Sequence, residues 1–133
     1  MKLSLGGGIS SVSRTVIDGV SLAFEFSVKT DNTGTSNDDQ FTIPINAGTF
    51  NYDISTDGGY SATGVTGAHT ITFSSGAGTY NVVITGTFPG MKFSNGGDKL
   101  KLLTIDNWGI YGVGSTSQRF AFWGCSNLVV NAT

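Results

Sequence analysis

The chain has 133 residues, a formal net charge of −2, and only 12% charged residues. This length suits one domain with its own hydrophobic core. The scattered lysines and arginines exclude the basic stripe of a nucleic-acid-binding protein and the polybasic segment of a membrane-surface protein. Twenty glycines, with serine, threonine and asparagine in quantity, indicate an all-β fold of short strands joined by tight turns.

Export and disulfide formation are not indicated. Cys125 is the only cysteine, so no internal disulfide is possible. The first eight residues, Met-Lys-Leu-Ser-Leu-Gly-Gly-Gly, have one basic residue and no sustained apolar stretch, which does not fit a signal peptide. No segment approaches the roughly 18 apolar residues of a membrane-spanning helix. We therefore expect a chain that is made and first folds in the cytoplasm.

Residues 1–19 are rich in glycine and serine and only weakly patterned. They indicate an N-terminal arm, or an irregular first strand, ahead of a sandwich domain over 20–133. Such an end either frays or docks on a neighbouring subunit. The residues that we expect to make assembly contacts are Leu3, Leu5, Ile9 and Val12 in this arm, and Pro44 in the domain.

Alternating apolar residues predict the strands. The clearest runs from Leu22 to Val28, with one apolar and one mixed face, and a polar loop follows at 30–40. A second strand at 41–45 contains Pro44, which lacks a backbone donor and so places this strand at an edge. Further strands are predicted at 50–54, 60–65, 71–73, 80–84, 100–105 and 128–130.

Three local sequence patterns predict turns or repeated strands. Asn95-Gly96 predicts a two-residue hairpin turn, since both positions tolerate positive φ. Residues 116–123 predict one short helical turn at 118–123, capped by Ser or Thr and stopped by Gly124. Residues 48–55 and 78–85 repeat a Gly-Thr-aromatic-Asn pattern, which fits two equivalent strands of a sandwich, each entered by the same turn.

Two stretches resemble a known family. Residues 69–73 (His-Thr-Ile-Thr-Phe) and 76–82 (Gly-Ala-Gly-Thr-Tyr-Asn-Val) look like the paired strands of PKD-type immunoglobulin-like domains. The resemblance implies an immunoglobulin/PKD-like β-sandwich.

A broader resemblance spans most of the chain. Its segments are 28–36, 39–44, 85–90, 93–99, 103–109 and 122–128. Together these segments look similar to the module that precedes BspA-like leucine-rich repeats in bacterial surface proteins, which also occurs in stand-alone form among tailed-phage virion proteins. Two departures stand out: residues 53–59 lack the tryptophan of the family's Asp-Trp-Gly-Asp-Gly turn, and Phe-Trp-Gly-Cys-Ser-Asn-Leu at 122–128 is not followed by repeats.

No residue pattern indicates catalysis. Asp53 and Asp57 are the nearest carboxylate pair, but aspartates in turns usually bond their own backbone. His69, the only histidine, fits a structural strand residue better than a general base. No Gly-x-Ser-x-Gly elbow is present. We therefore expect no enzyme, no catalytic residue and no cofactor.

Other candidate sites also have plainer interpretations. The loop that holds Asp31, Asp38 and Asp39 is oxygen-rich, but its spacing does not match a calcium-binding loop, so no metal is expected. Cys125 has no basic neighbours in sequence that would activate a thiol, which favours a buried packing role. Trp108 and Trp123 suggest a sugar-stacking platform, yet core aromatics are more frequent in a small sandwich.

The sequence leaves two candidate functions for this chain. The first is a structural protein of a tailed-phage virion, a decoration (cement) protein on the capsid or a small tail or fibre component. It would associate with capsid or tail proteins and with copies of itself as a homo-oligomer on a lattice. The alternative is a binding module of a bacterial surface adhesin that recognises glycan or host protein.

Overall fold

The computed structural model describes residues 16–133, and this part of the chain is all-β. No helix occurs in it, and so none that would be long and apolar enough to cross a membrane. The strands are β1 (Val16–Ile17), β2 (Val20–Ser21), β3 (Phe24–Lys29), β4 (Gln40–Ile43), β5 (Asn51–Thr56), β6 (Ser61–Val65), β7 (His69–Thr72), β8 (Thr79–Thr87), β9 (Leu102–Asn107) and β10 (Val129–Val130). The predicted contacts Leu3, Leu5, Ile9 and Val12 lie outside the described residues.

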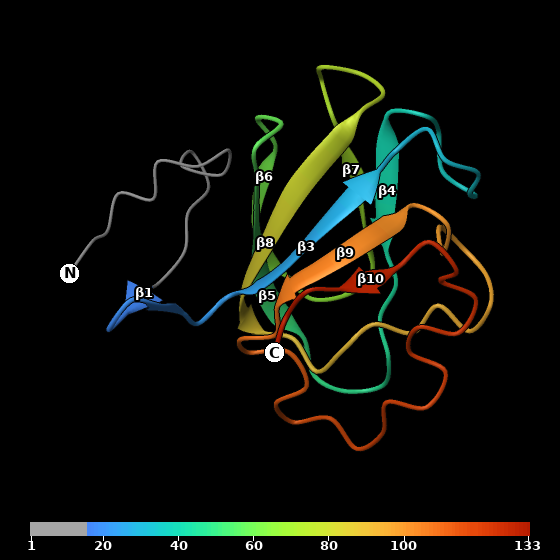
Figure 1. The fold of residues 1–133 in the computed structure, drawn as a ribbon. Helices are drawn as coiled ribbons and strands as arrows, with labels where there is room; N and C mark the ends of the chain where they lie inside the picture. Colours follow the sequence, from blue (N-terminus) through green and yellow to red (C-terminus); the bar gives the residue numbers. More distant parts are fainter. Residues whose placement is uncertain (1–15) are drawn as a thin grey trace.

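The strands form one large sheet and two small ones (Figure 1). The large sheet has six strands in the order β10-β9-β3-β8-β5-β6. Its neighbours are antiparallel except β9 and β10, which run parallel. β4 pairs with β7, and β1 pairs with β2, each as a separate two-stranded antiparallel sheet.

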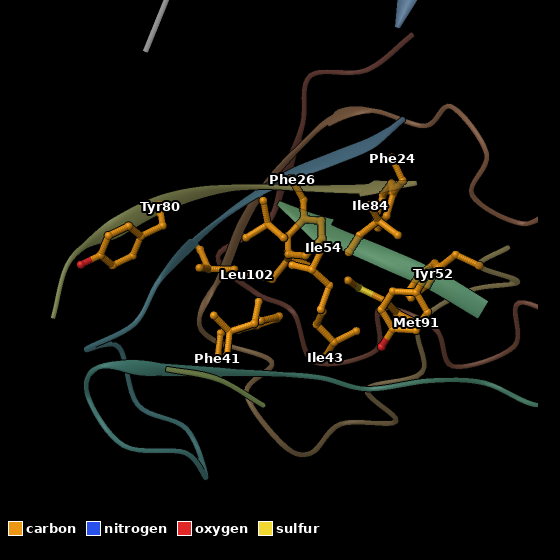
Figure 2. Close-up of a cluster of buried hydrophobic side chains, with 14 of the residues drawn as sticks. Phe24, Phe26, Phe41, Ile43, Tyr52, Ile54, Tyr80, Ile84, Met91 and Leu102 are labelled. Atoms are coloured by element: carbon orange, nitrogen blue, oxygen red, sulfur yellow. The ribbon is translucent and has the colours of Figure 1, made fainter. Parts of the chain in front are cut away.

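The core lies between the large sheet and the β4–β7 pair. Figure 2 shows Phe41 and Ile43 of β4 directed at Phe26, Ile54 and Leu102 of the large sheet, and all five are at most 2% exposed. Because period-two alternation places one face of each strand on this core, the arrangement is consistent with a β-sandwich.

β3 is more deeply buried than its alternation predicts. It lies between β8 and β9 at the centre of the large sheet. Its mixed face is covered as well as its apolar face, since Glu25 and Ser27 are each only 8% exposed. On this second face, Ala23 packs with Val83 of β8 in a small apolar cluster.

The repeated Gly-Thr-aromatic-Asn segments become β5 and β8, which are hydrogen-bonded neighbours in one sheet. Ile54 and Ile84, equivalent positions of the two copies, lie directly opposite each other in the antiparallel register. The repeat therefore places like residues across a single ladder.

The predicted helical turn at 118–123 is wrong. Residues 119–124 form consecutive turns, and Phe120 has a φ of +64°, which no right-handed helix accommodates. The carbonyls of Phe120, Ala121 and Trp123 accept hydrogen bonds from the backbone of residues 93–95 instead of from their own segment. Pairing with this neighbouring turn replaces the helical hydrogen bonds.

Two further predictions need adjustment. β4 ends at Ile43, so Pro44 follows this strand instead of lying inside it. Among the described strands, β4 pairs with β7 alone, so its other side is an open edge, as the prediction of an edge strand required. The turn predicted at Asn95-Gly96 is centred one residue earlier, because Ser94 and Asn95 have positive φ and Gly96 N–H donates to the Phe93 carbonyl at 2.9 Å.

Candidate functional site

The structure separates the two aspartates that were weighed as an acid–base pair. Asp53 accepts a hydrogen bond from Gly64 N–H at 2.9 Å. Asp57 accepts two from Asn81, one from its backbone N–H at 2.9 Å and one from its side-chain amide at 2.7 Å. The expectation that each would bond its own turn is therefore wrong: both carboxylates tie β5 and its end to neighbouring strands.

His69 and the acidic loop also take structural positions. The His69 ring is hydrogen-bonded to the Tyr60 hydroxyl, which links β7 of the small sheet to the start of β6. Asp31 forms an ion pair with Lys29 at 2.6 Å. In residues 16–133, no three His, Cys, Asp or Glu side chains are grouped as a metal site would require.

Two charged residues that no sequence pattern had indicated, Asp98 and Lys101, are buried, at 1% and 0% exposed. The Asp98 carboxylate accepts bonds from the backbone N–H groups of Thr35, Ser36 and Thr42 and from the Ser36 hydroxyl. Burial alone would raise the pKa of Asp98, but these hydrogen bonds, led by that of the Ser36 side chain, outweigh it and lower the pKa. Asp98 is thus held as a carboxylate.

The Lys101 ammonium completes this network. It donates to the carbonyls of Ser36, Asn37 and Gln40 at 3.2, 2.8 and 3.0 Å, and to the Ser36 hydroxyl at 2.9 Å. The two charges therefore hold loop 30–40 in one conformation. The sequence signal was a lysine inside the apolar run at 100–105.

Cys125 packs against the hydrophobic core, as expected. Burial raises the pKa of its thiol to about 11, and nearby Lys99 offsets this only in part. Because the thiolate is the reactive form of cysteine, this position is chemically inert near neutral pH.

The two tryptophans have different environments. Trp108 packs against the core, with its ring 6.2 Å from Phe24 and 5.2 Å from Tyr111. Trp123 is 54% exposed, which contradicts the expectation that both are core residues. Its ring lies 5.3 Å from that of Phe120, itself 41% exposed, and the Arg119 guanidinium lies 4.7 Å from the Phe120 ring centre. We call Arg119, Phe120 and Trp123 the aromatic platform.

A second exposed apolar surface lies on the β1–β2 hairpin. Ile17, Val20 and Leu22, which follows the hairpin, are 54%, 59% and 41% exposed. Figure 1 shows this hairpin outside the body of the domain, away from the segment that carries the aromatic platform. Pro44 is half-buried and belongs to neither surface. Exposed apolar side chains also occur at Val113 and on β10, at Val129 and Val130.

Comparisons with protein-family models, with curated proteins and with solved structures found no match for this chain.

Proposed function

We propose that this chain is a non-enzymatic structural protein of a tailed-phage virion, a decoration protein on the capsid or a small tail component. It acts by protein–protein association with capsid or tail proteins and with copies of itself. The observation that carries the proposal is the apolar hairpin β1–β2, which stands outside the domain.

The hairpin has the properties of a docking element. Its strands are only two residues long, and a lone two-stranded hairpin is marginal in water. Ile17 and Val20 are both more than half exposed. Because each side chain is already nearly half buried, covering the rest in an interface would contribute about 1–1.5 kcal/mol per residue.

Open sheet edges offer a second means of association. β10 is one edge of the large sheet and β6 is the other. Val129 and Val130 of β10 are 58% and 50% exposed. Exposed apolar edge strands favour pairing with another chain. The arm residues Leu3, Leu5, Ile9 and Val12, and Pro44, remain proposed contacts.

The finer fold assignment is part of the same proposal. Residues 69–73 and 76–82 resemble the paired strands of an immunoglobulin/PKD-like sandwich, and stand-alone modules of the related kind occur in virion proteins. The residues of the first segment build β7, and those of the second lead into β8. This support comes from the motifs, whereas the layered all-β core is compatible with several sandwich types.

Two experiments test the proposal. Mass spectrometry of purified particles should detect the chain in stoichiometric amounts, and its absence from every particle preparation would reject the virion role. In solution, Ile17→Asp and Val20→Asp should abolish self-association or binding to particles lacking the protein. The matched control is Val113→Asp, because Val113 is 67% exposed but lies in a different loop.

A further inference from the structure

The aromatic platform has a rigid backbone although its side chains are exposed. Phe93 N–H donates to the Ala121 carbonyl at 2.9 Å, Ser94 N–H to Phe120 at 3.1 Å, and Asn95 N–H to Trp123 at 2.8 Å. Ala121, between the two aromatic residues, is buried at 5% exposure. The backbone that carries the two rings is therefore held in place, which lowers the backbone entropy lost when a ligand binds.

Phe120 also holds a strained conformation. Its φ of +64° lies in the left-handed region, which costs a residue with a side chain about 1–2 kcal/mol. Its ring is only partly buried, at 41% exposed, and its ring contacts are with the exposed Trp123 and with Arg119. Strain that is not offset by packing tends to occur at functional sites.

Positively charged residues also lie on the segments that carry the aromatic platform. Of the lysines and arginines in residues 16–133, Lys29 is paired with Asp31 and Lys101 is buried. The other three, Lys92, Lys99 and Arg119, form no ion pair with a described carboxylate. Lys92 and Lys99 flank the turn at 93–95, and Arg119 precedes the segment 120–123 that is hydrogen-bonded to this turn.

Lys99 is one of these three residues. Its ammonium donates to the Asn95 carbonyl at 3.0 Å. Its Cδ lies beside Gly124, the residue after Trp123, where a Cβ would come within 2.7 Å of it. The side chain therefore runs along the edge of the platform, and an overall acidic protein presents a local basic, aromatic surface here.

We propose that the aromatic platform, with Lys99, binds a saccharide that carries a carboxylate. The apolar C–H face of a pyranose ring packs on the exposed ring of Trp123, beside the Phe120 ring that is tilted 39° to it. The guanidinium of Arg119, stacked on Phe120, keeps its N–H edge available for a two-point contact with the sugar carboxylate. The side-chain amide of Asn95, whose Oδ1 lies beside Gly124, is suited to a sugar hydroxyl group.

The charge distribution favours this ligand over a nucleic acid. A single-stranded nucleic acid needs a basic groove that follows several phosphates, and Arg119 and Lys99 alone do not extend that far. The proposal is independent of assembly through the β1–β2 hairpin, because the two surfaces lie apart.

The test is direct titration of the full chain. The probes are a galacturonic acid tetrasaccharide and sialyllactose, each compared with its neutral counterpart, the methyl-esterified tetrasaccharide and lactose. Calorimetry and the fluorescence of exposed Trp123 report binding. We expect saturable binding of at least one acidic probe, binding at least about tenfold weaker for its neutral counterpart, and weakening by added salt.

Point variants test whether the saccharide binds at the aromatic platform. Trp123→Ala and Arg119→Gln should each weaken binding by about tenfold or more, at unchanged thermal stability. Lys29→Gln removes a cation elsewhere and should change affinity less than about twofold. The proposal is overturned if neither acidic probe binds, if the neutral sugars bind equally, if Trp123→Ala has no effect, or if oligothymidylate binds more tightly. Ile17→Asp should leave sugar binding intact, so assembly and sugar binding can fail separately.

Discussion

Asp98 and Lys101 share one hydroxyl group, that of Ser36, which donates to the Asp98 carboxylate at 2.6 Å and accepts from the Lys101 ammonium at 2.9 Å. The two charges are thus joined through a neutral residue of loop 30–40. Gly34 lies against both, since a Cβ there would come within 2.8 Å of Lys101 Cε and 3.2 Å of Asp98 Cγ. The network is satisfied only as a whole, so it fixes the loop on the sheet.

Lys101→Met should destabilise the fold strongly. Methionine fills similar space but removes the four hydrogen bonds that the Lys101 ammonium donates to the Ser36 hydroxyl and to the carbonyls of Ser36, Asn37 and Gln40. Breaking one partner of a buried charged network costs about 3–5 kcal/mol. Urea denaturation measures the loss, with Lys92→Met as the control because Lys92 is exposed. Equal midpoints for the two variants would contradict the structural role of Lys101.

Acid should weaken the same network. The folded-state pKa of Asp98 is below its usual value of 3.8, because the hydrogen bonds to the carboxylate outweigh its desolvation. A lowered pKa contributes stability that is fully present above 3.8 and is lost as the pH falls through the folded-state value. The melting temperature should therefore fall below about pH 4. Asp98→Asn should lower the melting temperature at pH 7 and should make the melting temperature less dependent on pH below about pH 4. If that dependence on pH is unchanged in the variant, other groups cause the acid sensitivity.

Strand alternation made much of the fold predictable. Phe24, Phe26, Tyr52 and Ile84 are all buried where period two placed them. The pairing order was not predictable, because sheet order depends on contacts between residues far apart in the chain. The turns at 118–123 show the same limit. Local signals favoured a helix, but the carbonyls of this segment accept hydrogen bonds from the backbone of residues 93–95 instead.

The candidate site was predictable only in part. The sequence flagged Trp123 as a possible stacking residue but could not distinguish it from Trp108, since exposure depends on the tertiary structure. Phe120 gave no signal, because its positive φ arises from the pairing with the 93–95 turn. Asp98 and Lys101 are three residues apart, yet their partners lie more than 50 residues away in loop 30–40 and at Thr42.

Gly58→Ala should destabilise the end of the core. Phe73 and Tyr80 stack with ring centres 3.9 Å apart, and Gly58 lies against both rings. A Cβ at Gly58 would come within 2.7 Å of Phe73 Cδ1 and 2.6 Å of Tyr80 Cδ1. Overpacking of this kind costs about 1–3 kcal/mol. The control is Gly67→Ala, where a Cβ meets nothing within 4 Å; calorimetric melting should separate the two variants.

Cys125 should resist alkylation in the native protein. Its pKa is raised from 9.0 to about 11 by burial, so the thiolate fraction at pH 8 falls roughly a hundredfold. Half-burial reduces access further. Iodoacetamide labelling followed by mass spectrometry should be slow in buffer and fast in urea. Rapid labelling of folded protein would show that the thiol is exposed and activated.

Phe120→Gly should leave stability within about 0.5 kcal/mol of the parent or raise it. Glycine removes the strain of the positive φ, which offsets the lost contacts of a ring that is 41% exposed and the added chain entropy. Phe122→Ala makes the matched comparison, because Phe122 packs against Phe93, Trp108 and Tyr111 and its loss should cost about 3 kcal/mol. If Phe120→Gly proves as destabilising as Phe122→Ala, Phe120 is held for packing. If Phe120→Gly leaves stability unchanged, folding does not require the Phe120 ring. An exposed ring on a strained backbone that folding does not require is expected of a residue retained for binding.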